Sequence, residues 1–82
     1  SIPSVKLRKV LWEKALKGIA DIEDKNLSLL AEKYELAGGS IKNIIQFAWL
    51  HAKGKNIKIN KEILLMGIRR ELIKDGKTFN KL

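Results

Sequence analysis

In four separate segments of this 82-residue chain, apolar residues recur at the spacing of an α-helix, and a glycine lies just after each segment. An apolar residue at i, i+3, i+4 and i+7 buries one face of a helix, and glycine readily ends one. The pattern therefore predicts an all-α fold, a compact bundle of four helices joined by short connections. The expected helices cover about residues 5–17, 27–36, 41–52 and 61–75.

Each expected helix has apolar rows that indicate its buried face. We expect these rows at Leu7, Leu11 and Ala15 with Val5, Trp12 and Leu16 in the first helix; at Leu27, Leu30, Ala31 and Tyr34 in the second; at Ile41, Ile44, Ile45, Ala48 and Ala52 in the third; and at Ile63, Leu64, Met66, Gly67, Ile68 and Leu72 in the fourth.

The ends of the helices have recognisable residues. Ser4, Ser40 and Asn60 are expected to cap the first, third and fourth helices, because their side chains accept hydrogen bonds from free helix amides. Gly38 is expected to end the second helix in a left-handed conformation. Residues 57–59 (Ile-Lys-Ile) are expected to form a short extended connector. Gly67, inside the fourth helix, indicates a close contact with another helix.

Composition limits the class of protein. No apolar run approaches the length of about 20 residues that crosses a membrane. There are no cysteines, which excludes disulfides and thiolate metal sites and favours a cytoplasmic protein. The formal charge of +8 comes from scattered basic residues, as on a solvated surface.

We interpret residues 1–4 as a linker or vector residues, residues 5–77 as the domain, and residues 78–82 as a flexible tail.

No catalytic or metal site is expected in this chain. The one histidine, His51, lies beside an apolar helix face, where a structural or surface role is usual. Gly76-Lys77-Thr78 matches the end of a phosphate-binding loop, G-x-x-x-x-G-K-[ST], but Glu71 stands where its first glycine is required. We interpret it as the end of a helix.

The segment Gly38-Gly39-Ser40 is the most informative one for function. Paired glycines let another group approach the backbone closely, and the start of the following helix has free amides and a positive potential. Lys42 adds a cation in the first turn of that helix, where it opposes the helix dipole unless an anion compensates. The combination favours an anionic or polar ligand.

The sequence resembles the C-terminal helical lid domain of AAA+ ATPases across nearly all of residues 5–77. The resemblance lies in the order and spacing of Arg8–Trp12, Leu29–Tyr34, Ala37–Asn43, Ala48 with Ala52, Ile57–Ile59 and Gly67–Leu72.

The resemblance implies a lid that closes over ATP bound in an adjacent P-loop domain, which also holds the Mg²⁺. The lid then couples the nucleotide state to a homo-oligomeric ring, usually a hexamer, while the isolated chain is monomeric. Leu11 matches the position that packs on the adenine, and Gly38 and Gly39 match the pair that lines the base and ribose. Lys42 matches the sensor-2 position, which often carries an arginine; lysine supplies a point charge there instead of a fork of donors.

Two other interpretations stay open. The second and third helices with their short turn have the outline of a helix-turn-helix DNA-binding domain, although the third helix offers only Lys42, Gln46 and Lys53 to read bases. Alternatively, Phe47, Trp49 and Leu50 form an exposed surface that docks on another protein.

Overall fold

A computed structural model describes residues 1–82 and contains four helices: α1 (Val5–Leu16), α2 (Asp24–Lys33), α3 (Gly38–Gly54) and α4 (Lys61–Lys74). The expected all-α fold with four helices is confirmed. The radius of gyration is 11.6 Å, and a compact chain of this length is expected to have a value of about 12 Å.

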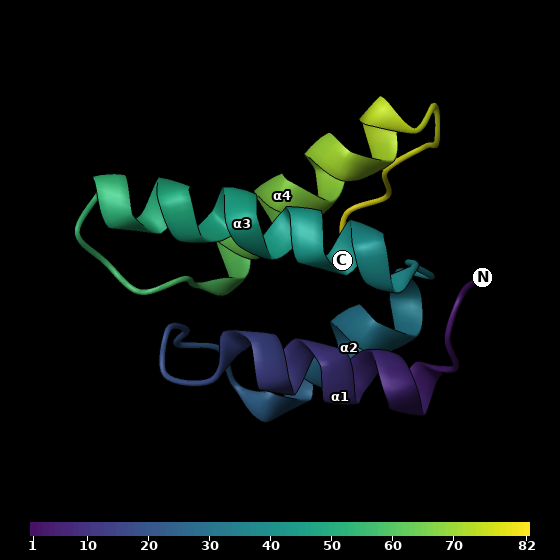
Figure 1. Cartoon of the computed structure of the whole chain (residues 1–82), viewed down its shortest axis with the longest axis horizontal. Coiled ribbons are helices and arrows are strands. Elements are labelled where there is room, and N and C mark those ends of the chain that lie inside the picture. The colour runs from purple at the N-terminus through teal and green to yellow at the C-terminus, as the bar shows by residue number, and fades with distance from the viewer.

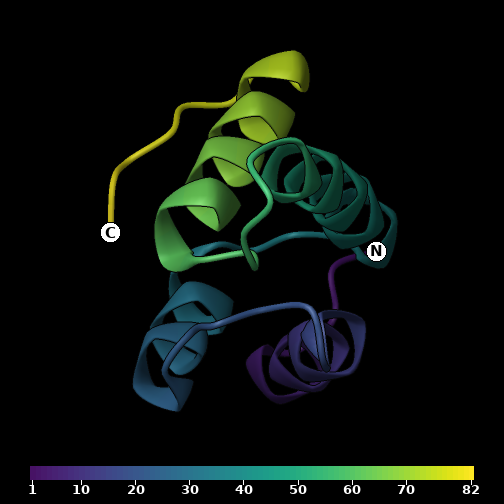
Figure 2. The same cartoon turned by 90° about the vertical axis from the view of Figure 1, so that its left-hand side faces the viewer.

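The helices lie in two layers. Figure 2 shows α1 and α2 side by side below α3 and α4. Helices α3 and α4 share the most extensive contact, and α1 packs against both α2 and α3. The first helix and the third run in the same general direction across the molecule (Figure 1). No helix of the chain is both long and apolar enough to cross a bilayer.

Capping side chains start α1 and α4, and a glycine with positive φ follows each of these two helices. Ser4 Oγ accepts a hydrogen bond from the amide of Leu7 at 3.2 Å, and Asn60 Oδ1 accepts one from the amide of Ile63 at 2.9 Å. Both expected caps are thus confirmed. Gly18 and Gly76 follow α1 and α4 with φ values of +80° and +73°, which L-residues with a side chain rarely adopt.

The junction between α2 and α3 differs from the sequence prediction. Helix α2 ends at Lys33, residues 34–37 are not helical, and α3 begins at Gly38 with Ala37 as its N-cap. The predicted left-handed Gly38 and the predicted Ser40 cap are both wrong. The physical reason is burial: Tyr34 and Leu36, two residues apart, both point into the core from the non-helical segment. An extended chain places such residues on one side, and a helix does not.

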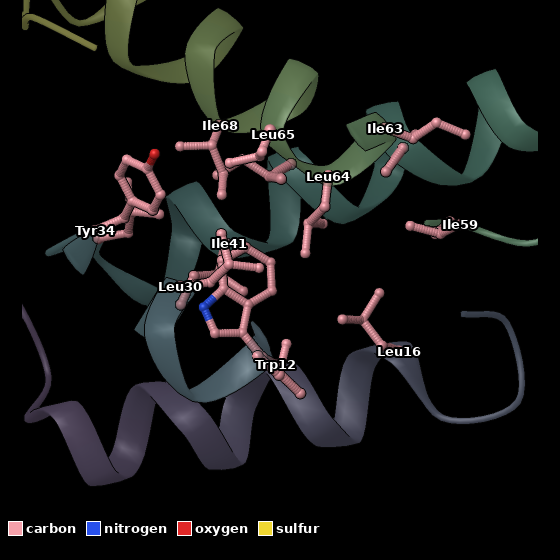
Figure 3. Close-up of a cluster of buried hydrophobic side chains, with 14 of the residues drawn as sticks. Trp12, Leu16, Leu30, Tyr34, Ile41, Ile59, Ile63, Leu64, Leu65 and Ile68 are labelled. Atoms are coloured by element: carbon pink, nitrogen blue, oxygen red, sulfur yellow. The ribbon is translucent and has the colours of Figure 1, made fainter. Parts of the chain in front are cut away.

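Seventeen buried apolar side chains make one core between the two layers. Figure 3 shows Trp12 of α1 pointing up towards Leu30 and Ile41, with Leu64 and Ile68 descending from α4. The expected stripe of α2 is buried, as are Ile41, Ile44, Ala48 and Ala52 of α3. Their helical spacing alone predicted these positions correctly.

The expected rows of α1 and α4 need correction. The buried residues of α1 are Arg8, Trp12 and Leu16, while Val5, Leu7 and Ala15 are exposed. Helix α1 lies at the edge of the molecule and buries only the narrow stripe that faces α2 and α3. On α4, Leu65 is buried and Met66 is exposed.

The connector between α3 and α4 ties the layers together. Ile59 is fully buried and forms an isolated parallel bridge with Ala20, which lies in the segment that follows α1. Its amide donates to the carbonyl of Ile19 at 3.0 Å, and its carbonyl accepts from the amide of Asp21 at 2.7 Å. The extended connector was expected, whereas its partner was not visible in the sequence.

Candidate functional site

The first turn of α3 is the candidate site, and its glycines have a different role from the one first expected. Gly38 and Gly39 have no positive φ, and a Cβ atom on either would meet no atom within 4 Å. They therefore serve neither a left-handed turn nor a close contact inside the chain. Both are exposed, so the first turn of α3 presents bare backbone to solvent.

The amides of this turn are free. The amide of Ile41 donates to the carbonyl of Ala37 at 3.1 Å, but those of Gly38, Gly39 and Ser40 have no acceptor within the chain. The N-cap residue, Ala37, has no side chain that accepts from them, and the first turn contains no acidic residue. A helix start of this kind carries a positive potential that no residue of its own first turn neutralises.

Lys42 adds to that positive potential. It is exposed, lies one turn into α3 and forms no ion pair. Gly38, Gly39 and Lys42 are thus brought together at one end of α3, with three free amides. This arrangement suits an anionic ligand that arrives from outside the chain.

A buried carboxylate supports the turn from behind. Glu71 of α4 is only 6% exposed, and its Oε2 accepts from Asn43 Nδ2 at 3.2 Å while its Oε1 lies 3.0 Å from Lys74 Nζ. Burial acts to raise the pKa of Glu71, but the hydrogen bonds from Lys74 and Asn43 and the charge of Lys74 outweigh it, so the pKa is lowered. Ser40 contributes in the same direction. Glu71 therefore stays ionised and links α4 to the start of α3.

A second buried charge, Arg8, holds the N-terminal segment near the start of α3. Arg8 is 4% exposed; its Nε donates to the carbonyl of Ala31 at 2.8 Å and its Nη1 to that of Pro3. Ala31 lies in the last turn of α2, where a cation is favourable. Figures 1 and 2 both place the N-terminal segment beside the start of α3. Sequence reasoning missed Arg8, although its spacing of four residues from Trp12 was a usable signal.

Leu11 lies on α1, whereas the other candidate residues, Gly38, Gly39 and Lys42, lie on α3. It is half-buried on α1, where it packs against the edge of the core. None of the five best-formed surface hollows is lined by Leu11, Gly38, Gly39 or Lys42. The candidate residues thus lie on an open surface, and the chain by itself encloses no nucleotide pocket there.

Catalytic groups are sparse in the structure. No three His, Asp or Glu side chains gather in an arrangement that holds a metal ion. His51 is half-buried and stacks on Phe47 with ring centroids 5.8 Å apart. The tail residues that follow α4 are held against the domain at one point, where Phe79 stacks on Tyr34 and the carbonyl of Asn80 accepts from the Tyr34 hydroxyl at 2.7 Å.

No protein-family model matches the chain, and neither does any curated protein or solved structure.

Proposed function

We propose that this chain is the C-terminal lid subdomain of an AAA+ ATPase, which closes over ATP bound in an adjacent P-loop domain. The observation that carries the proposal is the start of α3, where three unpaired amides and Lys42 meet in a first turn that has no acidic residue of its own. The order of the motifs that resemble the AAA+ lid supports it, as does the position of the N-terminal segment at the same end.

The residues present suit a nucleotide. The free amides of Gly38, Gly39 and Ser40 are donors for the polar edge of the base, the ribose or a phosphate, because no acceptor in the chain competes for them. The missing Cβ atoms of the two glycines allow close approach. Lys42 provides a point charge at the sensor-2 position, and Leu11 provides an apolar surface for the adenine.

The remaining parts of the active site belong to the P-loop domain. That domain holds the phosphates and the Mg²⁺ and carries out hydrolysis, so the lid alone is not an enzyme. Its own contribution is to complete one wall of the pocket and to move with the nucleotide state. In a homo-oligomeric ring, usually a hexamer in this family, that movement reaches the neighbouring subunits.

Titration of ATP into this chain and into the full-length protein tests the proposal. We expect negligible binding by the lid alone and clear binding by the full-length protein, weakened by Lys42→Ala but unchanged by Lys55→Ala, an exposed lysine at the far end of α3. Tight ATP binding by the lid alone, or none by the full-length protein, contradicts the proposal. A Walker A and a Walker B segment upstream of Val5 in the gene is a further expectation.

The helix-turn-helix alternative has less support. In that motif the second and third helices pack on each other, whereas here α3 packs mainly on α4 and then on α1. A labelled DNA duplex titrated at two salt concentrations separates the two interpretations. Sequence-specific binding that survives high salt favours the DNA-binding interpretation over the lid.

A further inference from the structure

The side of α3 and α4 that is turned away from α1 and α2 is not covered by any other part of the chain (Figure 2). Two adjoining hollows of about 600 Å³ and 480 Å³ lie on these two helices and share Phe47, Arg70 and Lys74. No residue from α1, α2 or the tail lines either of them. We call this surface the α3–α4 groove, and its principal residues are Phe47, Leu50, Met66, Arg69, Arg70 and Ile73.

The hollow that contains Met66 and Ile73 is mainly apolar, whereas the hollow around Leu50 is lined mostly by polar side chains. Leu50 is 64% exposed, Ile73 55% and Met66 45%. Phe47 is half-buried and lies against Gly67 of α4. Such a row of exposed apolar side chains in a hollow, with a polar rim, is typical of a surface that receives another apolar side chain.

The charges of the groove that have no ion-pair partner are positive. Arg69 and Arg70 form no ion pair within the chain, and the guanidinium of Arg70 lies over the Phe47 ring at 5.0 Å from its centroid. The only carboxylate in the lining is Glu71, and both of its oxygens are already engaged by Asn43 and Lys74. Two free guanidinium groups beside an apolar floor are complementary to carboxylates, which they bind as bidentate partners.

We propose that the α3–α4 groove binds an acidic amphipathic helix of a partner protein, with its apolar side chains against Phe47, Leu50 and Ile73 and its carboxylates on Arg69 and Arg70. The apolar floor favours a peptide over a nucleic acid, because phosphates interact with the cations alone. The hollows favour a helix over a membrane surface, because a helix inserts separate side chains into them. This proposal does not depend on the nucleotide role of α3.

The Phe47, Trp49 and Leu50 surface expected from the sequence is therefore divided. Phe47 and Leu50 belong to the groove, whereas Trp49 lines a different hollow, with Lys53 at 4.6 Å from its ring centroid. The two sides of α3 are separate surfaces, and only the side with Phe47 is shared with α4.

A labelled synthetic peptide of about 16 residues, about 24 Å long as a helix, tests the proposal in fluorescence anisotropy with the 82-residue chain. It carries leucines at i, i+3, i+4 and i+7 among glutamates. Two comparison peptides replace every leucine by serine or every glutamate by glutamine. We expect binding of the first peptide, at least about tenfold weaker binding of each comparison peptide, and weakening of binding by added salt.

Paired variants locate the binding site. The double variants Arg69→Glu/Arg70→Glu and Leu50→Ser/Ile73→Ser are each expected to weaken binding about tenfold or more. Lys6→Glu/Lys14→Glu makes the same charge change on exposed residues of α1, and Leu7→Ser/Leu29→Ser changes two leucines of α1 and α2 that are about half exposed; both are expected to bind as the unmodified chain does. Circular dichroism verifies that each variant is folded.

Several outcomes overturn the proposal. These are absence of binding to the acidic amphipathic peptide, equal loss of binding in the two control variants, or equal binding of the peptide without leucines. Tighter binding to duplex DNA, or to vesicles that contain phosphatidylserine, that is lost in the same groove variants also overturns it, because the groove then serves a different partner.

Discussion

Substitution of Gly67 by alanine is expected to destabilise the chain, although alanine is the better helix former. In a helix interior, Gly→Ala normally contributes about 1 kcal/mol in favour of folding. At Gly67 a Cβ atom would lie 3.0 Å from Ile44 Cγ2, 3.3 Å from the Ile44 carbonyl oxygen and 3.3 Å from Phe47 Cδ2. Carbon atoms pack best at about 3.5–4.0 Å, so the added methyl overlaps α3 on two residues.

The expected magnitude follows from those two opposing effects. An extra methyl in a filled contact costs about 1–3 kcal/mol, which exceeds the gain in helix propensity. We therefore expect Gly67→Ala to lower the free energy of unfolding by about 1 kcal/mol, or the melting temperature by about 4–8 °C in a domain of this size. Gly67→Val adds two further methyls and is expected to cost about 3 kcal/mol.

Urea unfolding followed by circular dichroism and by tryptophan fluorescence measures these changes, since Trp12, one of the two tryptophans, is fully buried in the core and becomes exposed on unfolding. Gly39→Ala is the matched control: it makes the same chemical change in the first turn of a helix, where no atom lies within 4 Å of the new Cβ. That variant is expected to stabilise the chain by up to about 1 kcal/mol. The reasoning is refuted if both alanine variants raise the free energy of unfolding equally.

Two further substitutions test the buried charges. Glu71→Gln is expected to lower the free energy of unfolding by about 1 kcal/mol at neutral pH. Because the pKa of Glu71 is lowered on folding, its carboxylate stabilises the fold above the unfolded-state pKa. This stabilisation is lost as the pH falls through the folded-state pKa. As the pH is lowered below about 4, the free energy of unfolding should therefore fall less steeply in Glu71→Gln than in the unmodified chain. Equal slopes in the two proteins contradict an ionised Glu71 that is paired with Lys74 and Asn43. Arg8→Met keeps the apolar stem but leaves the Ala31 and Pro3 carbonyls without their donor, with an expected cost of about 1–3 kcal/mol in urea unfolding. A variant as stable as the unmodified chain shows that neither hydrogen bond contributes.

Much of the candidate site could be predicted from sequence because its residues are neighbours in the chain. Gly38, Gly39 and Lys42 lie within a stretch of five residues (38–42), so a mistaken helix boundary still left them together. The conformation of the glycines could not be predicted in the same way. A pair of glycines is compatible both with a left-handed turn after a helix and with the first turn of the next helix. Burial of Tyr34 and Leu36 in the core decided between these two conformations.

Sequence by itself determined the number of helices, their caps at Ser4 and Asn60 and the buried stripes of α2 and α3, since helical periodicity and capping are interactions within a few residues. Tertiary structure alone decided the hydrogen-bond partners of Arg8 and Glu71, because each partner lies on another segment: Ala31 for Arg8, and Asn43 for Glu71. It also decided that Ile59 pairs with Ala20 and that Phe47 shares a groove with α4. Such contacts join residues distant in the chain, and no local pattern encodes which helix faces which.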